Sequence, residues 1–524
     1  MGSLGKLAEL ASGNKTYWAC YLLGLAATLV LTPLVIRIAQ ALEVVDRPSN
    51  RKIHKSPTPL LGGLSIFAGM WLPLVLLSLW DNQITRELAK GGWAELGVVF
   101  GAGLVMVLTG AVDDKWGLNA RWKFAVQIPL AALLVWGGVH FEVIKAPFFG
   151  TLELGYWGPV LSVVWIVGVT NALNLIDGID GLAAGVAFFV SGTNAIVALL
   201  NGNTLLALVM WSMAGACLGF LRYNFSPARI FLGDTGSLFL GVTLAVTSIE
   251  ANAKGSVATS MAIPVLVLGY PVLDTLLSMV RRALRGKSMF TGDTGHIHHR
   301  LLARGLDQRH TALILYGVCG LFCFVGLASV LGSDVWVGLG LAAIATVFGA
   351  GLWALGYLRY FSREAAGERP LYRIAFLFSE ITKERFKLAE RREEIFELLR
   401  EACDEFGMMG LEVSCPAGPG GGAFHARWLL EGRGRSPARK HLPQPQDAAL
   451  SQEMYQFQDT GLAVLVFFPK AELGSDLQME YRTLIGEVLA AANRRLLELT
   501  QAQVLRARLE PLANPPSTEA VSPS

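Results

Sequence analysis

The sequence predicts an all-α polytopic membrane protein with about eleven transmembrane helices and a C-terminal cytoplasmic α+β domain. Two observations predict this fold class. The chain of 524 residues is 53% hydrophobic and 16% charged, with a mean hydropathy of +0.46, whereas soluble domains carry about 25% charged residues. The long apolar runs all lie within residues 17–357. Residues 358–510 have a soluble composition, and the Pro- and Ser-rich residues 511–524 are expected to be disordered.

Eleven apolar stretches have the length that a helix needs to cross the ~30 Å hydrocarbon layer, which is about 20 residues. Three of the connections between them are very short, so ten spans is an alternative count. Residues 1–16 form an N-terminal tail with no short apolar region and cleavage site, and no cleaved signal peptide is expected. The stretches are residues 17–40, 60–80, 94–112, 123–140, 156–176, 181–200, 204–221, 231–250, 258–280, 311–332 and 335–357.

The positive charges are distributed unevenly over the connections between these spans. The odd-numbered connections carry sixteen Lys and Arg residues, and the even-numbered connections carry four. An excess of Lys and Arg marks the cytoplasmic side of a membrane. We therefore expect the N-terminus outside, the odd connections inside and the C-terminal domain in the cytoplasm, although Lys6 and Lys15 in the tail oppose this orientation.

Carboxylates gather at the predicted cytoplasmic ends of the spans. Adjacent carboxylates at a membrane boundary are costly to desolvate, and intramembrane acids usually have a function. Solvated turns are the simple alternative, and for an Asp that begins a helix the alternative is an N-cap. Otherwise the acids either bind a cation or transfer a proton, and Mg²⁺ is a cation that prefers carboxylates combined with substrate phosphates. The five aspartates are Asp113, Asp114, Asp177, Asp180 and Asp234.

Asparagines and glycines accompany the acids after the fifth span. Asn171, Asn174 and Asp177 are spaced by three residues and therefore share one helix face. Gly178 and Gly181 permit a tight bend and a close approach of the backbone. Asparagines that only pack helices together are the alternative interpretation, but this set favours a ligand-binding cleft.

Histidines and basic residues gather in two odd connections. His296, His298 and His299 allow zinc in principle, but the surrounding residues are carboxylates, Arg and Lys, which favours phosphate recognition over a zinc site. The basic and Pro-rich residues 51–63, with Lys55 among them, are interpreted either as a positive-inside anchor or as an anion-binding lip.

Four motifs, in this order, resemble those of the polyprenyl-phosphate N-acetylhexosamine-1-phosphate transferases. The resemblance covers roughly residues 15–357 and implies a reaction: a UDP-N-acetyl sugar loses UMP, and its sugar phosphate passes to undecaprenyl phosphate. It also implies a bacterial inner (plasma) membrane location and Mg²⁺ as cofactor, with Mn²⁺ as a substitute. The motifs are Asp113-Asp114-x-x-Gly117-Leu118, Asn171-x-x-Asn174-x-x-Asp177-Gly178-x-Asp180-Gly181-Leu182, Phe231-x-Gly233-Asp234-x-Gly236-Ser237 and His296-x-His298-His299-Arg300.

The resemblance also implies roles for individual residues. Asp234 would be the principal Mg²⁺ ligand, and Asp113 and Asp114 would lie beside the lipid phosphate, with Asp113 as its base. Direct attack without a base stays open, because the second pKa of a phosphate is roughly 6. Lys123 would help to hold phosphate. The expected substrate contacts are Phe231, Asn224 and Asp180 at the uridine, Asn174 and Asp177 in the same cleft, His296, His298, His299 and Arg300 at the phosphate or sugar end, and Lys55 at the nucleotide.

The histidine motif bears on which sugar the enzyme uses, and the resemblance indicates its binding partners. His-Ile-His-His-Arg replaces the three consecutive histidines of the phospho-MurNAc-pentapeptide translocases, which resembles enzymes that use UDP-GlcNAc to start teichoic acid, O-antigen of lipopolysaccharide or capsule. UDP-GalNAc, a deoxy amino sugar and UDP-MurNAc-pentapeptide stay open. The expected partners are the sugar nucleotide, the polyprenyl phosphate, the bilayer and a second copy in a homodimer, but no nucleic acid. A membrane transporter and an inactive scaffold with a sensor domain are the rival classes.

The C-terminal domain has no recognisable catalytic motif. A helical pattern over residues 372–407 is followed by four candidate strands and a closing helix over 475–499. This order predicts a small α+β module that either regulates the enzyme or serves as an interaction domain. The candidate strands are residues 410–415, 423–430, 453–458 and 461–468.

Overall fold

The computed structural model divides the chain into two compact units, and each is described by itself. The first contains residues up to 358 except for two short segments, and the second contains the residues from 359 onward together with those segments. The residues described are 15–46, 57–146, 150–253, 262–285, 295–330, 334–355, 357, 363–405, 408, 410–416, 423–429, 450–457, 460–469 and 484–502.

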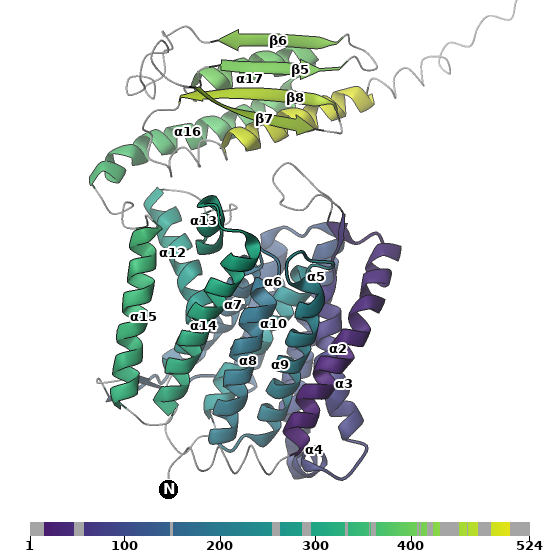
Figure 1. Cartoon of the computed structure of the whole chain (residues 1–524), viewed down its shortest axis with the longest axis vertical. Coiled ribbons are helices and arrows are strands. Elements are labelled where there is room, and N and C mark those ends of the chain that lie inside the picture. The colour runs from purple at the N-terminus through teal and green to yellow at the C-terminus, as the bar shows by residue number, and fades with distance from the viewer. Residues whose placement is uncertain are drawn as a thin grey trace, which may run out of the picture. The chain divides into compact units, whose positions relative to one another are not determined.

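The first unit is a bundle of long helices (Figure 1). Each of the eleven predicted apolar stretches contains helix, and the ninth contains two helices that are separated near residue 268. The long helices are α2 (Lys15–Ala41), α3 (Gly62–Leu77), α5 (Trp93–Trp116), α6 (Ala120–Trp136), α7 (Trp157–Ile176), α8 (Leu182–Leu200), α9 (Thr204–Asn224), α10 (Gly233–Ala253), α12 (Gly269–Arg285), α14 (Gln308–Val330) and α15 (Asp334–Ala354).

Short elements join these helices. They are the helices α4 (Gln83–Glu87), α11 (Ala262–Val267) and α13 (Ile297–Ala303), a π-helical turn over Leu88–Gly92, and the antiparallel strand pairs β1 (Val45–Asp46) with β2 (Thr58–Pro59) and β3 (Val143–Ala146) with β4 (Gly150–Glu153).

Six helical segments in the described part of the chain are long and apolar enough to cross a membrane. The number of about eleven spans stays a prediction, because the other helices are too short or insufficiently apolar by the same measure. Large apolar side chains point outward on several of the six, among them Leu22, Val30, Leu108 and Val164, as expected for helices that face lipid. The chain is therefore a multi-pass membrane protein. The six segments are Lys15–Ala41, Gln83–Trp116, Trp157–Ile176, Leu182–Leu200, Thr204–Asn224 and Gln308–Val330.

Close helix contacts in the first unit depend on small residues. A Cβ added to Gly110 in α5 would lie 2.3 Å from the carbonyl oxygen of Asp234, at the start of α10. Only a glycine therefore lets the two backbones approach so closely, as is common between membrane helices. This contact brings the polar end of α5, one turn further on, to the N-terminus of α10.

The second unit is an α+β module built on a four-stranded antiparallel sheet in the order β6-β5-β8-β7. One face of the sheet presents buried side chains such as Val413 and Val464, which pack on Phe396 of α17 and Leu489 of the last helix. The first strand predicted from sequence is present with the same bounds, and the other three are present with shifted ends. The elements are α16 (Arg363–Leu388), α17 (Arg392–Glu405), β5 (Gly410–Cys415), β6 (Phe424–Leu429), β7 (Leu450–Phe457), β8 (Leu462–Pro469) and a helix over 484–502.

Candidate active site

Asp114, near the end of α5, binds the first turn of α10. Its carboxylate accepts hydrogen bonds from the backbone N–H of Asp234 at 2.8 Å, from the backbone N–H of Thr235 at 3.1 Å and from the Thr235 hydroxyl at 2.6 Å. A carboxylate is stabilised at a helix N-terminus by the unpaired N–H groups and the helix dipole. Asp114 was predicted to lie beside the lipid phosphate, but here both of its oxygens have intramolecular donors.

Gly233 makes this contact possible. Its φ is +69°, and a Cβ at this position would lie 2.5 Å from Oδ2 of Asp114. The backbone conformation and the lack of space both require glycine, because a side chain is strained in the left-handed region. Gly233, in the third motif, therefore fixes the position of the Asp234 backbone, from which the Asp234 side chain extends.

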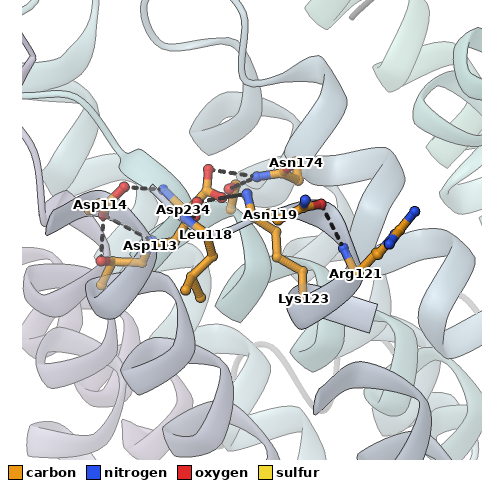
Figure 2. A network of polar contacts seen from close by, with 10 residues as sticks. Asp113, Asp114, Leu118, Asn119, Arg121, Lys123, Asn174 and Asp234 are labelled. Atoms are coloured by element: carbon orange, nitrogen blue, oxygen red, sulfur yellow. Dashed lines mark hydrogen bonds and ion pairs between the residues drawn. The ribbon is translucent and has the colours of Figure 1, made fainter. Parts of the chain in front are cut away.

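Lys123, in the first turn of α6, links two carboxylates from two other helices (Figure 2). Its Nζ lies 2.6 Å from Oδ2 of Asp113 and also contacts Oδ2 of Asp234. The side chains of all three are between 11% and 23% exposed, so solvent screens the attraction only in part. An ammonium group between two carboxylates shows that this point stabilises a cation.

The second oxygen of each carboxylate also has a donor. Asn174, near the end of α7, donates to Oδ1 of Asp234 at 2.9 Å and to the Ser237 hydroxyl at 2.8 Å. The backbone N–H of Leu118 donates to Oδ1 of Asp113. Four helices, α5, α6, α7 and α10, thus meet at one polar point, which Figure 2 shows from close by. We call Asp113, Asp114, Lys123 and Asp234 the carboxylate cluster.

The predicted uridine residues lie around the segment that joins α9 to α10. Oδ2 of Asp180 accepts the N–H of Ala228 at 3.0 Å. Asn224 is buried and donates to the carbonyl of Ile230 at 2.9 Å. The half-buried Phe231 is positioned by its backbone, whose N–H donates to the carbonyl of Pro59 at 2.9 Å. Asp180 and Asn224 therefore shape the segment that presents Phe231.

The histidine motif folds around a buried acid that the sequence analysis did not select. Asp274 of α12 is fully buried, lies 2.9 Å from Nδ1 of His296 and accepts the N–H of Ile297 at 2.9 Å. Arg300 is also buried, donates to the carbonyl of Leu355 at 2.6 Å and lies over the Tyr357 ring. His296 and Arg300 thus have structural partners in this loop. The available signal for Asp274 was an acid inside the ninth apolar stretch.

His298 and His299 differ in their surroundings. The His298 ring is completely buried, and burial, followed by the neighbouring His299, lowers its pKa to about 3. Neither ring nitrogen of His298 has a hydrogen-bonding partner within the described ranges. His299 is half-buried, with its ring 4.3 Å from that of His298. Of the two, His299 is therefore better placed to meet a substrate.

The end of α7 connects the carboxylate cluster with the histidine loop, residues 295–303. Asn174 contacts Asp234 on one side. On the other side, a Cβ added to Gly178 would lie 2.4 Å from Nε2 of His298. Asp177, between them, caps the end of α7 and is half-buried. Of the predicted site residues, Lys55 lies outside the described residues. The contacts around the end of α7 join Asp113, Asp114, Lys123, Asn174 and Asp234, and they reach His298 through Gly178.

The carboxylate cluster fits a magnesium ion by its chemistry. Among the residues that the structure describes, no group of three or more His, Cys, Asp and Glu side chains is arranged to hold a metal. Mg²⁺, however, is commonly bound by only one or two carboxylates, with water and substrate phosphates completing its coordination. Asp113 and Asp234 direct two oxygens at one cation position, which meets that requirement.

The fold and this arrangement define a class: multi-pass membrane proteins with a carboxylate cluster built from helix ends. Comparison with known proteins specifies the family. Residues 96–252, which contain the whole carboxylate cluster, match the family model described as glycosyl transferase family 4. The chain belongs to this family, because relatives are similar to it over most of their own length.

Three relatives illustrate the similarity. A probable undecaprenyl-phosphate N-acetylglucosaminyl 1-phosphate transferase of Bacillus subtilis (strain 168) is 38% identical over 332 residues, which cover 63% of this chain and 88% of the relative. A decaprenyl-phosphate N-acetylglucosaminephosphotransferase of Mycobacterium leprae (strain TN) is 37% identical over 59% of this chain and 83% of its own. A phospho-N-acetylmuramoyl-pentapeptide-transferase of Moorella thermoacetica is 33% identical over 58% of this chain and 96% of its own.

Proposed function

We propose that this chain transfers an N-acetylhexosamine 1-phosphate, in the first place GlcNAc 1-phosphate, from a UDP-sugar to undecaprenyl phosphate. UMP leaves, and the lipid product starts a cell-surface glycan. The observation that carries this proposal is the meeting of Asp113, Lys123 and Asp234 from three helices at one point, in a chain whose relatives carry such transferase names. The cluster is suited to two phosphate groups that must react with each other.

In the reaction, an oxygen of the lipid phosphate attacks the phosphorus that bears the sugar, and the bond from that phosphorus to the UMP oxygen breaks. Lys123 offsets the repulsion between the two anions by its positive charge. Asp113, beside Lys123, either accepts a proton from the lipid phosphate or only orients it, because a phosphate is largely ionised at neutral pH. Positioning of the two reactants accounts for much of the remaining rate.

Asp234 and Asp113 would hold Mg²⁺, or Mn²⁺ in its place. The bound ion would supply positive charge to the diphosphate and to the leaving UMP. Asp114 acts indirectly in this proposal, since its hydrogen bonds to the first turn of α10 hold Asp234 in place. Asn174 orients the Asp234 carboxylate from the other side.

The nucleotide and the sugar would bind beside the cluster. Phe231 stacks on the uracil, while Asp180 and Asn224 hold the segment that carries it. Asp177, at the end of α7, lines the same cleft. His299, supported by His298, meets the phosphate or sugar end, and Lys55 contributes from the connection between the first two spans.

We also propose how the chain lies in the membrane. It crosses the bacterial inner membrane about eleven times, with the N-terminus outside and the carboxylate cluster at the cytoplasmic face. Residues 17–357 form the transferase domain, and residues 358–510 form a cytoplasmic module of regulatory or interaction type. The asymmetry of Lys and Arg between odd and even connections supports this orientation. A homodimer is part of the same proposal.

The names of the relatives and the histidine motif bear on which sugar is transferred. Relatives with N-acetylglucosaminyl names reach 38% identity, and the relative named for N-acetylmuramoyl-pentapeptide is 33% identical. The His-Ile-His-His-Arg motif favours the first group over UDP-MurNAc-pentapeptide. UDP-GalNAc and a deoxy amino sugar are the alternatives that the same cluster would serve.

The experiment is a release assay with the purified full chain, polyprenyl phosphate, Mg²⁺ and a panel of UDP-N-acetyl sugars. UMP should appear with UDP-GlcNAc, and only when the lipid phosphate is present. Turnover with another sugar of the panel would change the substrate but keep the reaction. The absence of UMP with every sugar would reject the enzyme class in favour of a transporter or an inactive scaffold.

A further inference from the structure

We propose that Lys123 occupies the cation position of the metal-free enzyme, and that a divalent ion must displace its ammonium group to bind. The displaced Lys123 then becomes available to the phosphates of the substrates. This inference deepens the proposed function and rests on it, because it takes the carboxylate cluster as the metal site.

The hydrogen bonds of the two carboxylates direct a shared metal ion toward the position of the Lys123 ammonium group. Oδ1 of Asp113 accepts the N–H of Leu118, and Oδ1 of Asp234 accepts the amide of Asn174 at 2.9 Å. The remaining oxygens, both Oδ2 atoms, contact the same Lys123 Nζ, at 2.6 Å in the case of Asp113. An ion that binds Asp113 and Asp234 together through these two Oδ2 atoms therefore takes the place of Nζ.

Asp114 cannot replace either ligand without cost to the fold. Its oxygens accept three hydrogen bonds from Asp234 and Thr235 at 2.6–3.1 Å. A metal bound to Asp114 would take this acceptor away from the N–H groups of the first turn of α10, and those donors would be left unsatisfied. The Lys123 ammonium group and the metal ion therefore cannot both lie between Asp113 and Asp234, because two cations at one point repel strongly in a half-buried site.

The exchange makes the site more positive by two charges. With their carboxylates ionised, the four residues of the carboxylate cluster carry a net charge of −2. Adding a divalent ion brings this charge to zero, with the released ammonium still nearby at the end of a flexible four-carbon side chain. The first state repels a diphosphate, and the second no longer does. The enzyme should consequently bind the metal before, or together with, the sugar nucleotide.

The test measures Mn²⁺ binding to the full chain by electron paramagnetic resonance, without sugar nucleotide or lipid phosphate. Lys123→Met should bind Mn²⁺ at least about tenfold more tightly than the wild type, because binding no longer breaks charge-assisted hydrogen bonds. Arg121→Met is the matched control. Arg121 lies in the same helical turn but is exposed and points away from Asp234 (Figure 2), so its loss should leave the affinity close to that of the wild type.

Equal or weaker Mn²⁺ binding by Lys123→Met would overturn the inference, as would an equal gain in Arg121→Met. A second measurement needs no variant. The rate at which an amine-reactive reagent labels Lys123, followed by mass spectrometry, should rise when Mn²⁺ saturates the wild-type protein. An unchanged or slower rate would contradict displacement. A chain that shows this competition but releases no UMP would reject the proposed function and leave the inference intact.

Discussion

The carboxylate cluster and the histidine loop lie on either side of the end of α7. They differ in the charge of their side chains, because the cluster contains paired charged groups and the loop contains a buried neutral histidine. In the cluster, Asp113 and Asp234 are paired through the half-buried Lys123. In the loop, His298 is buried without a hydrogen-bonding partner among the described residues, and its low pKa keeps it neutral. We therefore expect the cluster to act on the substrate through charge and the loop to act mainly through its shape.

A substitution of Asp234 gives the strongest test of this difference between the cluster and the loop. We expect Asp234→Asn to lower kcat/KM for UMP release by about 10²–10³-fold or more, because the side chain keeps its size but loses the charge that binds a cation. Asp307→Asn is the control, since it makes the same chemical change at an exposed aspartate that is paired with His310. Full activity of Asp234→Asn in the release assay would remove the basis for a metal site in the cluster.

Much of this cluster was predictable from the sequence. Asp113, Asn174 and Asp234 each lie at the end of an apolar stretch, and the positive-inside pattern predicts that those ends lie on one side of the membrane. Because span ends on one side of a membrane lie at similar depth, the sequence predicts that these side chains come close together. In the structure, Asn174 donates to Asp234, and Lys123 links Asp234 to Asp113.

Other parts could not be predicted, because a sequence does not give side-chain direction or partners. Asp113 and Asp114 are adjacent, yet Asp113 faces Lys123 while Asp114 turns to the N-terminus of α10. Asp274 lies inside an apolar stretch that was interpreted as a simple span, and its pairing with His296 depends on a contact across 22 residues. The break between α11 and α12 in that stretch was not predicted either.

A second prediction tests whether the loop acts through shape. We expect Gly178→Ala to lower kcat/KM by up to about 10²-fold, the loss that a displacement of about 1 Å can cause, because the new Cβ would lie 2.4 Å from Nε2 of His298. Gly168→Ala in α7 is the control, since a Cβ there meets nothing within 4 Å. If both variants keep wild-type kinetics in the release assay, the contact between the α7 end and the loop does not matter.

A third prediction concerns the support of the loop. Asp274→Asn keeps an acceptor for the N–H of Ile297 but loses the charge beside His296. Hydrogen bonds to charged groups contribute about 1.5–3 kcal/mol, so we expect a loss of roughly tenfold in kcat/KM and a lower unfolding temperature. Steady-state kinetics and thermal unfolding measure the two effects. Unchanged values for both would show that Asp274 does not support the histidine motif.

The smallest effect should appear in the pH dependence of stability. The pKa of His298 is about 3 in the folded protein, against an ordinary value of 6.5. Between these values the unfolded state binds more protons, so the contribution of His298 to stability is complete above pH 6.5 and is lost as the pH falls, by at most about 1.4 kcal/mol per pH unit. Its ionisable neighbours are His299, Asp274 and His296.

His298→Gln removes this titration while the same neighbours stay in place. Its unfolding temperature should therefore fall less between pH 7.5 and pH 5.5 than that of the wild type. His310→Gln, which changes an exposed histidine, should retain the wild-type fall, and other titrating groups contribute equally to all three proteins. If His298→Gln shows the same fall as the wild type, the ring is accessible to protons in the folded state, and the loop resembles the carboxylate cluster more closely than its burial indicates.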